Sequence, residues 1–187
     1  ASMLLPALNR ARDKAKTISC SSNLKQMGIY FSLYTDNYDG VFPLQYDRTR
    51  GSSWYFWYSG IKDNVGAGFA DKTLLCPSDS DNTVTSYGFD SHWGRKYTAT
   101  SWYCGGPKKL SRFKNPAHLI VILDSLRPDF SAFYSGWMNY FPMLRHKNTF
   151  NILFADGHVK NMKDRSFGLY AGSADGWPRD DSRWVQW

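Results

Sequence analysis

A long helical segment at the start of the chain limits what this protein can fold into. Between Leu4 and Gly40, apolar or small residues recur at spacings of three and four, the period of one helix face. The stripe runs in order through Leu8, Ala11, Ala15, Ile18, Ser22, Leu24, Met27, Phe31 and Tyr34. We expect its small early residues to pack loosely or against other subunits, and its later aromatic residues to pack on a domain. Asn37 and Gly40, in the segment TDNYDG, are expected to end the helix.

Beyond Gly40 the chain loses helical periodicity and becomes rich in Gly, Ser, Asp and aromatic residues. One short helix is expected around Trp54 to Ile61. The segment LIVILD, residues 119–124, predicts a buried strand, and FNILFADGHVKNM predicts a hairpin with Asp156 and Gly157 as its two-residue turn. The predicted fold is α+β: a long N-terminal helix (1–40) packed on a small antiparallel sheet with long loops (41–187).

Composition narrows the class of protein without choosing one function. Aromatic residues make up 17% of the chain, which indicates a folded protein. The net charge of +7 would suit acidic partners, but Lys and Arg are scattered outside the helix start and the segment PKKLSRFK, so nucleic-acid binding is not favoured. The cluster SSWYFWYSG suits either a carbohydrate-binding or adhesive surface, or a cover of Trp54, Phe56 and Trp57 over the sheet.

Three cysteines bear on the cellular compartment. A disulfide between Cys20, on the helix, and Cys76, in LLCPSDSD, would tie the first long loop to the helix and requires an oxidising compartment. Cys104 is then left over. The alternative is three free buried thiols in a cytosolic protein. Because the chain has no CxxC pair, a structural zinc site is not expected.

A group of polar residues near the predicted hairpin has the composition of a functional site. Asp124, His146, Asp156 and His158 offer carboxylate and imidazole ligands for zinc or a similar metal. In the structural interpretation, which we favour, Asp156 adopts the positive φ of a type I′ turn and His146 hydrogen-bonds to that turn. Acid-base catalysis is a third interpretation. The motifs GxSxG, HExxH, GxxxxGK[ST] and GxGxxG are absent from the sequence, so we do not expect an enzyme.

Three segments together resemble a known family. They are LLPALNRARDKAKTISCSSNLKQMGIYFSLYTDNYDGVFP, then LLCPSD, then RHKNTFNILFADGHV. In this order they are similar to bacterial pseudopilins related to the major pseudopilin of type II secretion, in the prepilin-type processing-associated H-X9-DG group. The motif residues are His146, Asp156 and Gly157.

The resemblance implies a structural subunit of a type II secretion or type IV pilus-like filament. Such proteins carry a leader that prepilin peptidase removes, and an apolar helix that anchors them in the inner membrane with the head in the periplasm or on the cell surface. The segment MLLPAL, followed by Arg10 and Arg12, is typical of the exit from such a helix. The alternative is a free amphipathic N-terminal helix. Without that anchor the chain is expected to be soluble. Its partners would be other pseudopilin subunits and the assembly machinery, contacted through the helix face of Leu8, Ala11, Ala15 and Ile18.

Major pseudopilins of this kind also bind calcium near the C-terminus, so calcium is a possible ligand here. Asp175, Asp180 and Asp181 offer hard oxygen donors in the tail. The alternative is that these carboxylates are solvated and pair with Arg179 and Arg183. No other cofactor is expected.

Overall fold

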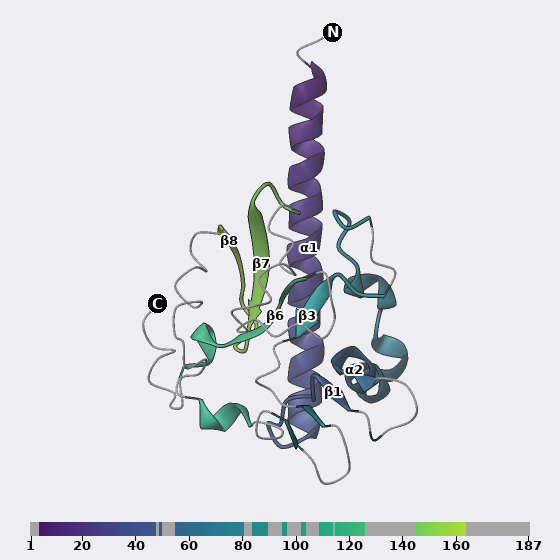
Figure 1. Cartoon of the computed structure of the whole chain (residues 1–187), viewed down its shortest axis with the longest axis vertical. Coiled ribbons are helices and arrows are strands. Elements are labelled where there is room, and N and C mark those ends of the chain that lie inside the picture. The colour runs from purple at the N-terminus through teal and green to yellow at the C-terminus, as the bar shows by residue number, and fades with distance from the viewer. Residues whose placement is uncertain are drawn as a thin grey trace.

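The long N-terminal helix dominates the fold. The computed structural model describes residues 4–47, 49, 55–80, 84–89, 95–96, 102–103, 109–113, 115–125 and 145–163. Helix α1 (Leu4–Asn37) lies along the longest axis of the molecule, and its first turns project beyond the described strands (Figure 1). Together with a small antiparallel sheet, this helix confirms the predicted α+β class. Among the described helices, none has the length and apolar character needed to cross a bilayer.

Helix α1 ends where the sequence predicted. Asp39 and Gly40 follow it with φ angles of 54° and 74°. The Gly40 N–H donates to the Thr35 carbonyl at 2.8 Å, which satisfies one of the carbonyls left open at a helix end. Gly40 adopts the left-handed conformation without a Cβ penalty, so the chain turns here toward the head.

The larger sheet lies beside α1 and contains β3 (Tyr87–Phe89), β6 (Ile120–Asp124), β7 (Thr149–Phe154) and β8 (Val159–Lys163). Its order is β3-β6-β7-β8, and every neighbouring pair is antiparallel. All residues of β6 are buried, which explains its unbroken apolar run. The strand predicted at 119–124 is confirmed as β6, and β7 with β8 confirms the predicted hairpin, although not its two-residue turn.

A second, smaller sheet was not predicted. It joins β1 (Tyr46–Asp47), β2 (Tyr55–Phe56), β4 (Arg95–Lys96) and β5 (Trp102–Tyr103) in the order β2-β1-β4-β5. β1 and β4 are parallel. Helix α2 (Trp57–Val65) is the expected short helix, although it begins after Trp54. Short 3-10 turns are η1 (Gly66–Gly68), η2 (Asp71–Leu74), η4 (Leu110–Arg112) and η5 (Pro116–His118).

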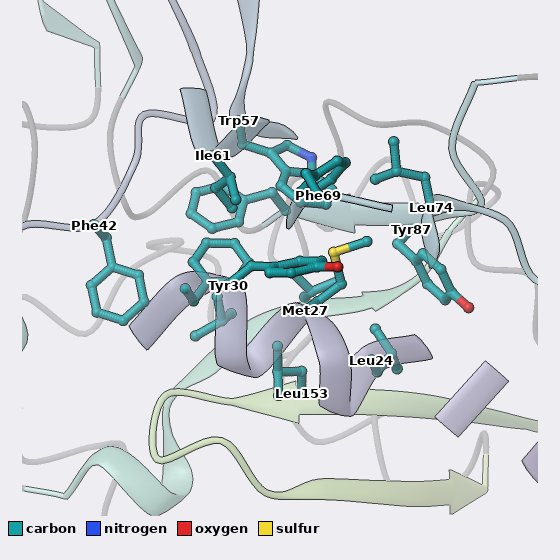
Figure 2. Close-up of a cluster of buried hydrophobic side chains, with 14 of the residues drawn as sticks. Leu24, Met27, Tyr30, Phe42, Trp57, Ile61, Phe69, Leu74, Tyr87 and Leu153 are labelled. Carbon is teal, nitrogen blue, oxygen red and sulfur yellow. The ribbon is translucent and has the colours of Figure 1, made fainter. Parts of the chain in front are cut away.

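The core forms where the C-terminal half of α1 meets α2 and the larger sheet. The Phe31 ring lies 5.5 Å from Phe89 and 5.8 Å from Trp57, centroid to centroid. Figure 2 shows the side chains around them, including Trp57 and Met27. Trp57 is fully buried, and Phe56 packs against the same cluster. These two rings therefore stabilise the core, as the structural interpretation of the aromatic cluster expected, and Trp54 lies outside the described residues.

The predicted single stripe along α1 is wrong, because it is two stripes on opposite faces. Leu24, Met27 and Phe31 are buried against the head, whereas Leu8 and Ile18 are 59% and 61% exposed. Ser22 and Leu24 are two residues apart and therefore point about 200° away from each other around the helix. The stripe from Leu8 to Ser22 and the stripe from Leu24 to Tyr34 thus lie on opposite faces.

Candidate functional site

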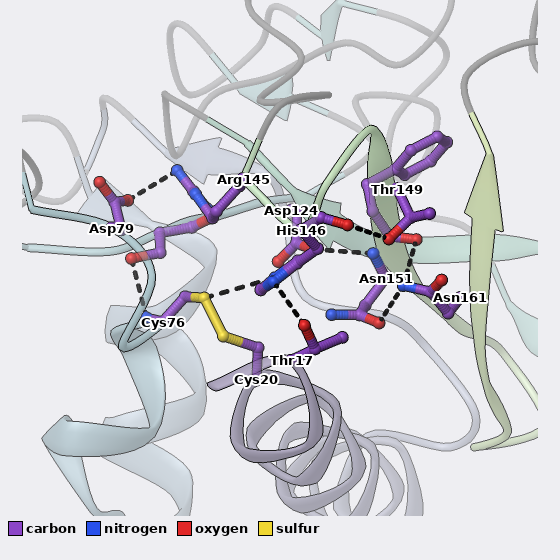
Figure 3. Close-up of polar contacts among 12 residues, drawn as sticks. Thr17, Cys20, Cys76, Asp79, Asp124, Arg145, His146, Thr149, Asn151 and Asn161 are labelled. Atoms are coloured by element: carbon purple, nitrogen blue, oxygen red, sulfur yellow. Dashed lines mark hydrogen bonds and ion pairs between the residues drawn. A yellow bond between two sulfur atoms is a disulfide. The ribbon is translucent and has the colours of Figure 1, made fainter. Parts of the chain in front are cut away.

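The most concentrated polar site is built around His146, in the turn that precedes β7. Its side chain is fully buried. Nε2 lies 3.2 Å from Asp124 Oδ2 and 3.5 Å from Cys76 Sγ, while Nδ1 lies 3.2 Å from Thr17 Oγ1 (Figure 3). The positive φ of Lys147 and Asn148, 54° and 65°, turns the chain sharply here. One imidazole thus joins α1, the loop after η2 and the end of β6.

The hydrogen bonds around His146 fix the protons on its ring. Thr17 Oγ1 donates its proton to the Asp13 carbonyl at 3.0 Å. It must therefore accept from Nδ1–H of His146. The contact between Nε2 and the Asp124 carboxyl then requires one further proton shared between these two atoms. His146 and Asp124 consequently form a buried pair with a single proton between them.

Asp124 ends β6 and is only half satisfied. Its Oδ2 also accepts the Asn151 backbone N–H at 2.7 Å, but its buried Oδ1 has no hydrogen-bond partner. The Asn151 side-chain oxygen accepts from Asn161 at 2.9 Å. A carboxylate oxygen left open in the interior is costly, which marks Asp124 as unusual in this core.

The disulfide between Cys20 and Cys76 is confirmed, with a Cα–Cα distance of 5.0 Å. Cys76 is also held by its backbone N–H, which donates to Ser86 Oγ at 2.9 Å. The bond fastens the loop after η2 to the buried face of α1. Cys104 lies outside the described residues.

An ion pair next to His146 was missed by the sequence reasoning. Arg145 Nη2 lies 2.7 Å from Asp79 Oδ2, and both side chains are 4% exposed. Arg145 also donates to the carbonyls of Ser86, at 2.8 Å, and Ser125, at 3.3 Å. The local signal was weak: Arg145 directly precedes His146, and Asp79 lies three residues after Cys76. This pair connects the same loop to β7 and the end of β6.

The other half of the H-X9-DG motif lies at the opposite end of β7. Gly157 has φ 87°, whereas Asp156 is not among the residues with positive φ, so the predicted type I′ turn is wrong. The Gly157 N–H donates to the Phe154 carbonyl at 2.9 Å, and the Phe154 N–H donates to the His158 carbonyl at 3.0 Å. This is the pattern of a three-residue loop with glycine in the left-handed position.

Asp156 pairs with its neighbour His158. Its Oδ1 accepts from the His158 backbone N–H at 3.1 Å and lies 2.6 Å from Nδ1 of the same residue. Burial raises the pKa of Asp156, but these hydrogen bonds outweigh it and hold the pKa below its ordinary value. The pair is exposed at the tip of the hairpin. The four residues predicted as one constellation thus form two pairs, Asp124 with His146 and Asp156 with His158, and His146 does not bond to the turn as expected.

Strand β7 is about as long as the stretch of α1, from Thr17 to Gly28, that its two ends contact. His146 contacts Thr17 at one end, and at the other end a Cβ on Gly28 would lie 3.5 Å from Gly157 Cα. Eleven residues of helix span about 16 Å, and β7 spans about 16 Å at roughly 3.3 Å per residue. His146 and Gly157 therefore dock the two ends of one strand on the same side of α1.

The predicted filament face lies elsewhere on α1. Leu8, Ala11, Ala15 and Ile18 are all exposed, and the stripe continues on the same side through Ile29 and Leu33, which are 54% and 47% exposed. The calcium candidates Asp175, Asp180 and Asp181 lie outside the described residues.

The His146 cluster does not have the arrangement of a catalytic triad. In a triad, the base uses one ring nitrogen for the nucleophile and the other for the orienting carboxylate. Here Nε2 faces both Cys76 and Asp124, and Cys76 is in a disulfide. Comparisons with protein-family models, with curated protein sequences and with solved structures find no match.

Proposed function

We propose that this chain is a pseudopilin-like structural subunit that assembles through α1 into a filament of the type II secretion or type IV pilus kind. The observation that carries this proposal is the division of α1 into two opposed apolar faces. One face is fixed to the head by the core and the Cys20–Cys76 disulfide. The other face presents Leu8, Ala11 and Ile18 to solvent.

The first turns of α1 are exposed to solvent, and an exposed ion pair joins Asp13 to Lys147 at 2.9 Å. Residues 5–15 are all exposed, although most helical stability in proteins comes from packing an apolar face. Leu5, Leu8 and Ile18 are 66%, 59% and 61% exposed, and large apolar residues gathered on one exposed face are typical of an interaction site. Ala11 and Ala15 would allow the backbone of a neighbouring helix to approach closely. A second copy of the same helix supplies a surface of matching size and character.

The sequence resemblance extends this proposal to location and partners. It implies an apolar anchor in the inner membrane, a precursor processed by prepilin peptidase, and contact with other pseudopilin subunits and their assembly machinery. The disulfide supports a head in the periplasm or on the cell surface, because such bonds persist in oxidising compartments.

The test places one negative charge on either side of the same exposed helix turns in the full-length protein. Ala11→Asp lies on the proposed contact face, and Asn9→Asp, also exposed, lies on the opposite face. Filaments sheared from producing cells are quantified by sedimentation and immunoblotting, and thermal melting of each head verifies folding. Ala11→Asp should abolish sedimentable filaments while Asn9→Asp retains them. Equal assembly of the two variants would overturn the proposal.

A further inference from the structure

We propose that the chain has a second, reduced state in which Cys20, Cys76, His146 and Asp124 bind one zinc ion in place of the disulfide. The sulfur atoms of both cysteines and a ring nitrogen of His146 all lie within 4.8 Å of one another, and all three residues are buried. Thiolate, imidazole and carboxylate are the ligands that zinc takes in proteins. This inference does not depend on how the chain assembles.

Two edges of a zinc tetrahedron are already in place. With Zn–S of about 2.3 Å and Zn–N of about 2.0 Å, tetrahedral geometry sets the N···S distance near about 3.5 Å and the N···O distance near about 3.3 Å. The distances from His146 Nε2 are 3.5 Å to Cys76 Sγ and 3.2 Å to Asp124 Oδ2. Two rearrangements are needed: the two sulfur atoms, bonded in the disulfide, separate to about 3.8 Å, and the Asp124 carboxylate, which is not part of the group within 4.8 Å, moves toward the sulfur atoms.

The surroundings prepare both the imidazole and the carboxylate for a metal. Nδ1–H of His146 donates to Thr17 Oγ1, which fixes the ring and directs Nε2 toward the sulfur. A metal-bound histidine is oriented in this way by a bond from its other nitrogen. Asp124 would bind through Oδ2, which lies 3.2 Å from Nε2, while its other oxygen, Oδ1, is buried without a hydrogen-bond partner. A zinc ion would replace the proton now shared by Nε2 and Asp124.

The two states interconvert by a balanced reaction. A dithiol reductant transfers two electrons and two protons to the disulfide, which yields two cysteine thiols and the oxidised reductant. Zinc then displaces the two thiol protons and the proton shared by His146 and Asp124, so three protons are released. The ion would hold the loop after η2 on α1 before oxidation, as the disulfide does afterwards. The lack of a CxxC motif is no obstacle, since Cys20 and Cys76 are 56 residues apart and His146 is 70 residues from Cys76.

The experiment uses the whole chain with Cys104→Ser, so that only two cysteines remain. The protein is reduced with a phosphine, freed of metal and titrated with Co²⁺ and then Zn²⁺. We expect one metal per chain, thiolate-to-cobalt charge-transfer absorption, a higher melting temperature with metal, and release of the metal on reoxidation. Thr17→Val should weaken zinc affinity by about 10- to 100-fold because it removes the bond that orients His146.

Matched measurements make each outcome decisive. His158→Ala removes the exposed histidine at the other end of β7 and should leave affinity unchanged. If the reduced chain loses structure without metal, zinc must restore its cooperative melting. Failure to restore it, a folded reduced chain without thiolate–cobalt absorption, or equal affinity of the Thr17→Val and parent proteins would overturn the proposal.

Discussion

Reduction of the Cys20–Cys76 disulfide in metal-free buffer should lower the free energy of unfolding by about 4 kcal/mol. The bond closes a loop with a sequence separation of 56, and the loop-closure entropy that it removes from the unfolded chain corresponds to about 4 kcal/mol at room temperature. The folded state should lose little else. Asn23 still donates to the Leu75 carbonyl at 2.8 Å, and Cys76 N–H still donates to Ser86, so the loop stays on α1.

The assay is urea unfolding of the Cys104→Ser chain, oxidised or reduced, with a chelator present and tryptophan fluorescence as the signal. Trp57 is fully buried and should report loss of the core. The free energy of unfolding of the reduced chain should also fall more steeply with urea concentration, because its unfolded state exposes more surface. Cys20→Ser/Cys76→Ser, also in that background, is the matched control and should behave as the reduced chain. A difference below about 1 kcal/mol would refute the loop-closure reasoning.

Three further predictions concern other contacts of the head. Arg145→Met should cost about 3–5 kcal/mol in urea unfolding, since it removes the cationic partner of a carboxylate that is only 4% exposed, and Asp79→Leu in the same chain should recover part of this loss. Gly28→Leu should destabilise the fold by about 1–3 kcal/mol in thermal melts, because even a Cβ there would lie 3.2 Å from a side chain of the hairpin; unchanged melting would contradict the docking of β7. The pKa of Asp156, raised by burial but lowered more by bonds from His158, lies below its ordinary value. The extra free energy of unfolding of the parent chain over Asp156→Asn should be complete above about pH 4 and decline as pH falls through the folded pKa. A difference between the two proteins that does not change with pH in urea unfolding at acid pH would contradict this.

Local patterns in the sequence were sufficient for the main elements. The end of α1 at Asn37 follows from Gly40, whose conformation depends on its own φ. Strand β6 follows from an apolar run whose residues are all buried. The smaller sheet could not be predicted, because strands of two residues carry no period and their pairing is set by distant segments.

The candidate site was predicted in some of its members, but Thr17 and the pair of Arg145 with Asp79 were missed. The pairing of Cys20 with Cys76 is confirmed, and the alternative of free thiols at these two positions is not. His146 was identified as important, but its partners are Thr17, 129 residues away, and Asp124 rather than the nearby turn. Asp156 was placed in a turn, but not in the correct type.

What the sequence determined by itself is therefore local: where the long helix ends, where the buried strands run, and which residues are chemically unusual. The tertiary structure decided which face of α1 meets the head and which stays exposed, and that His146 lies beside the disulfide. The physical reason is that helical period and turn chemistry act over a few residues, whereas contacts such as Arg145 with Asp79, 66 residues apart, exist only after the chain has packed.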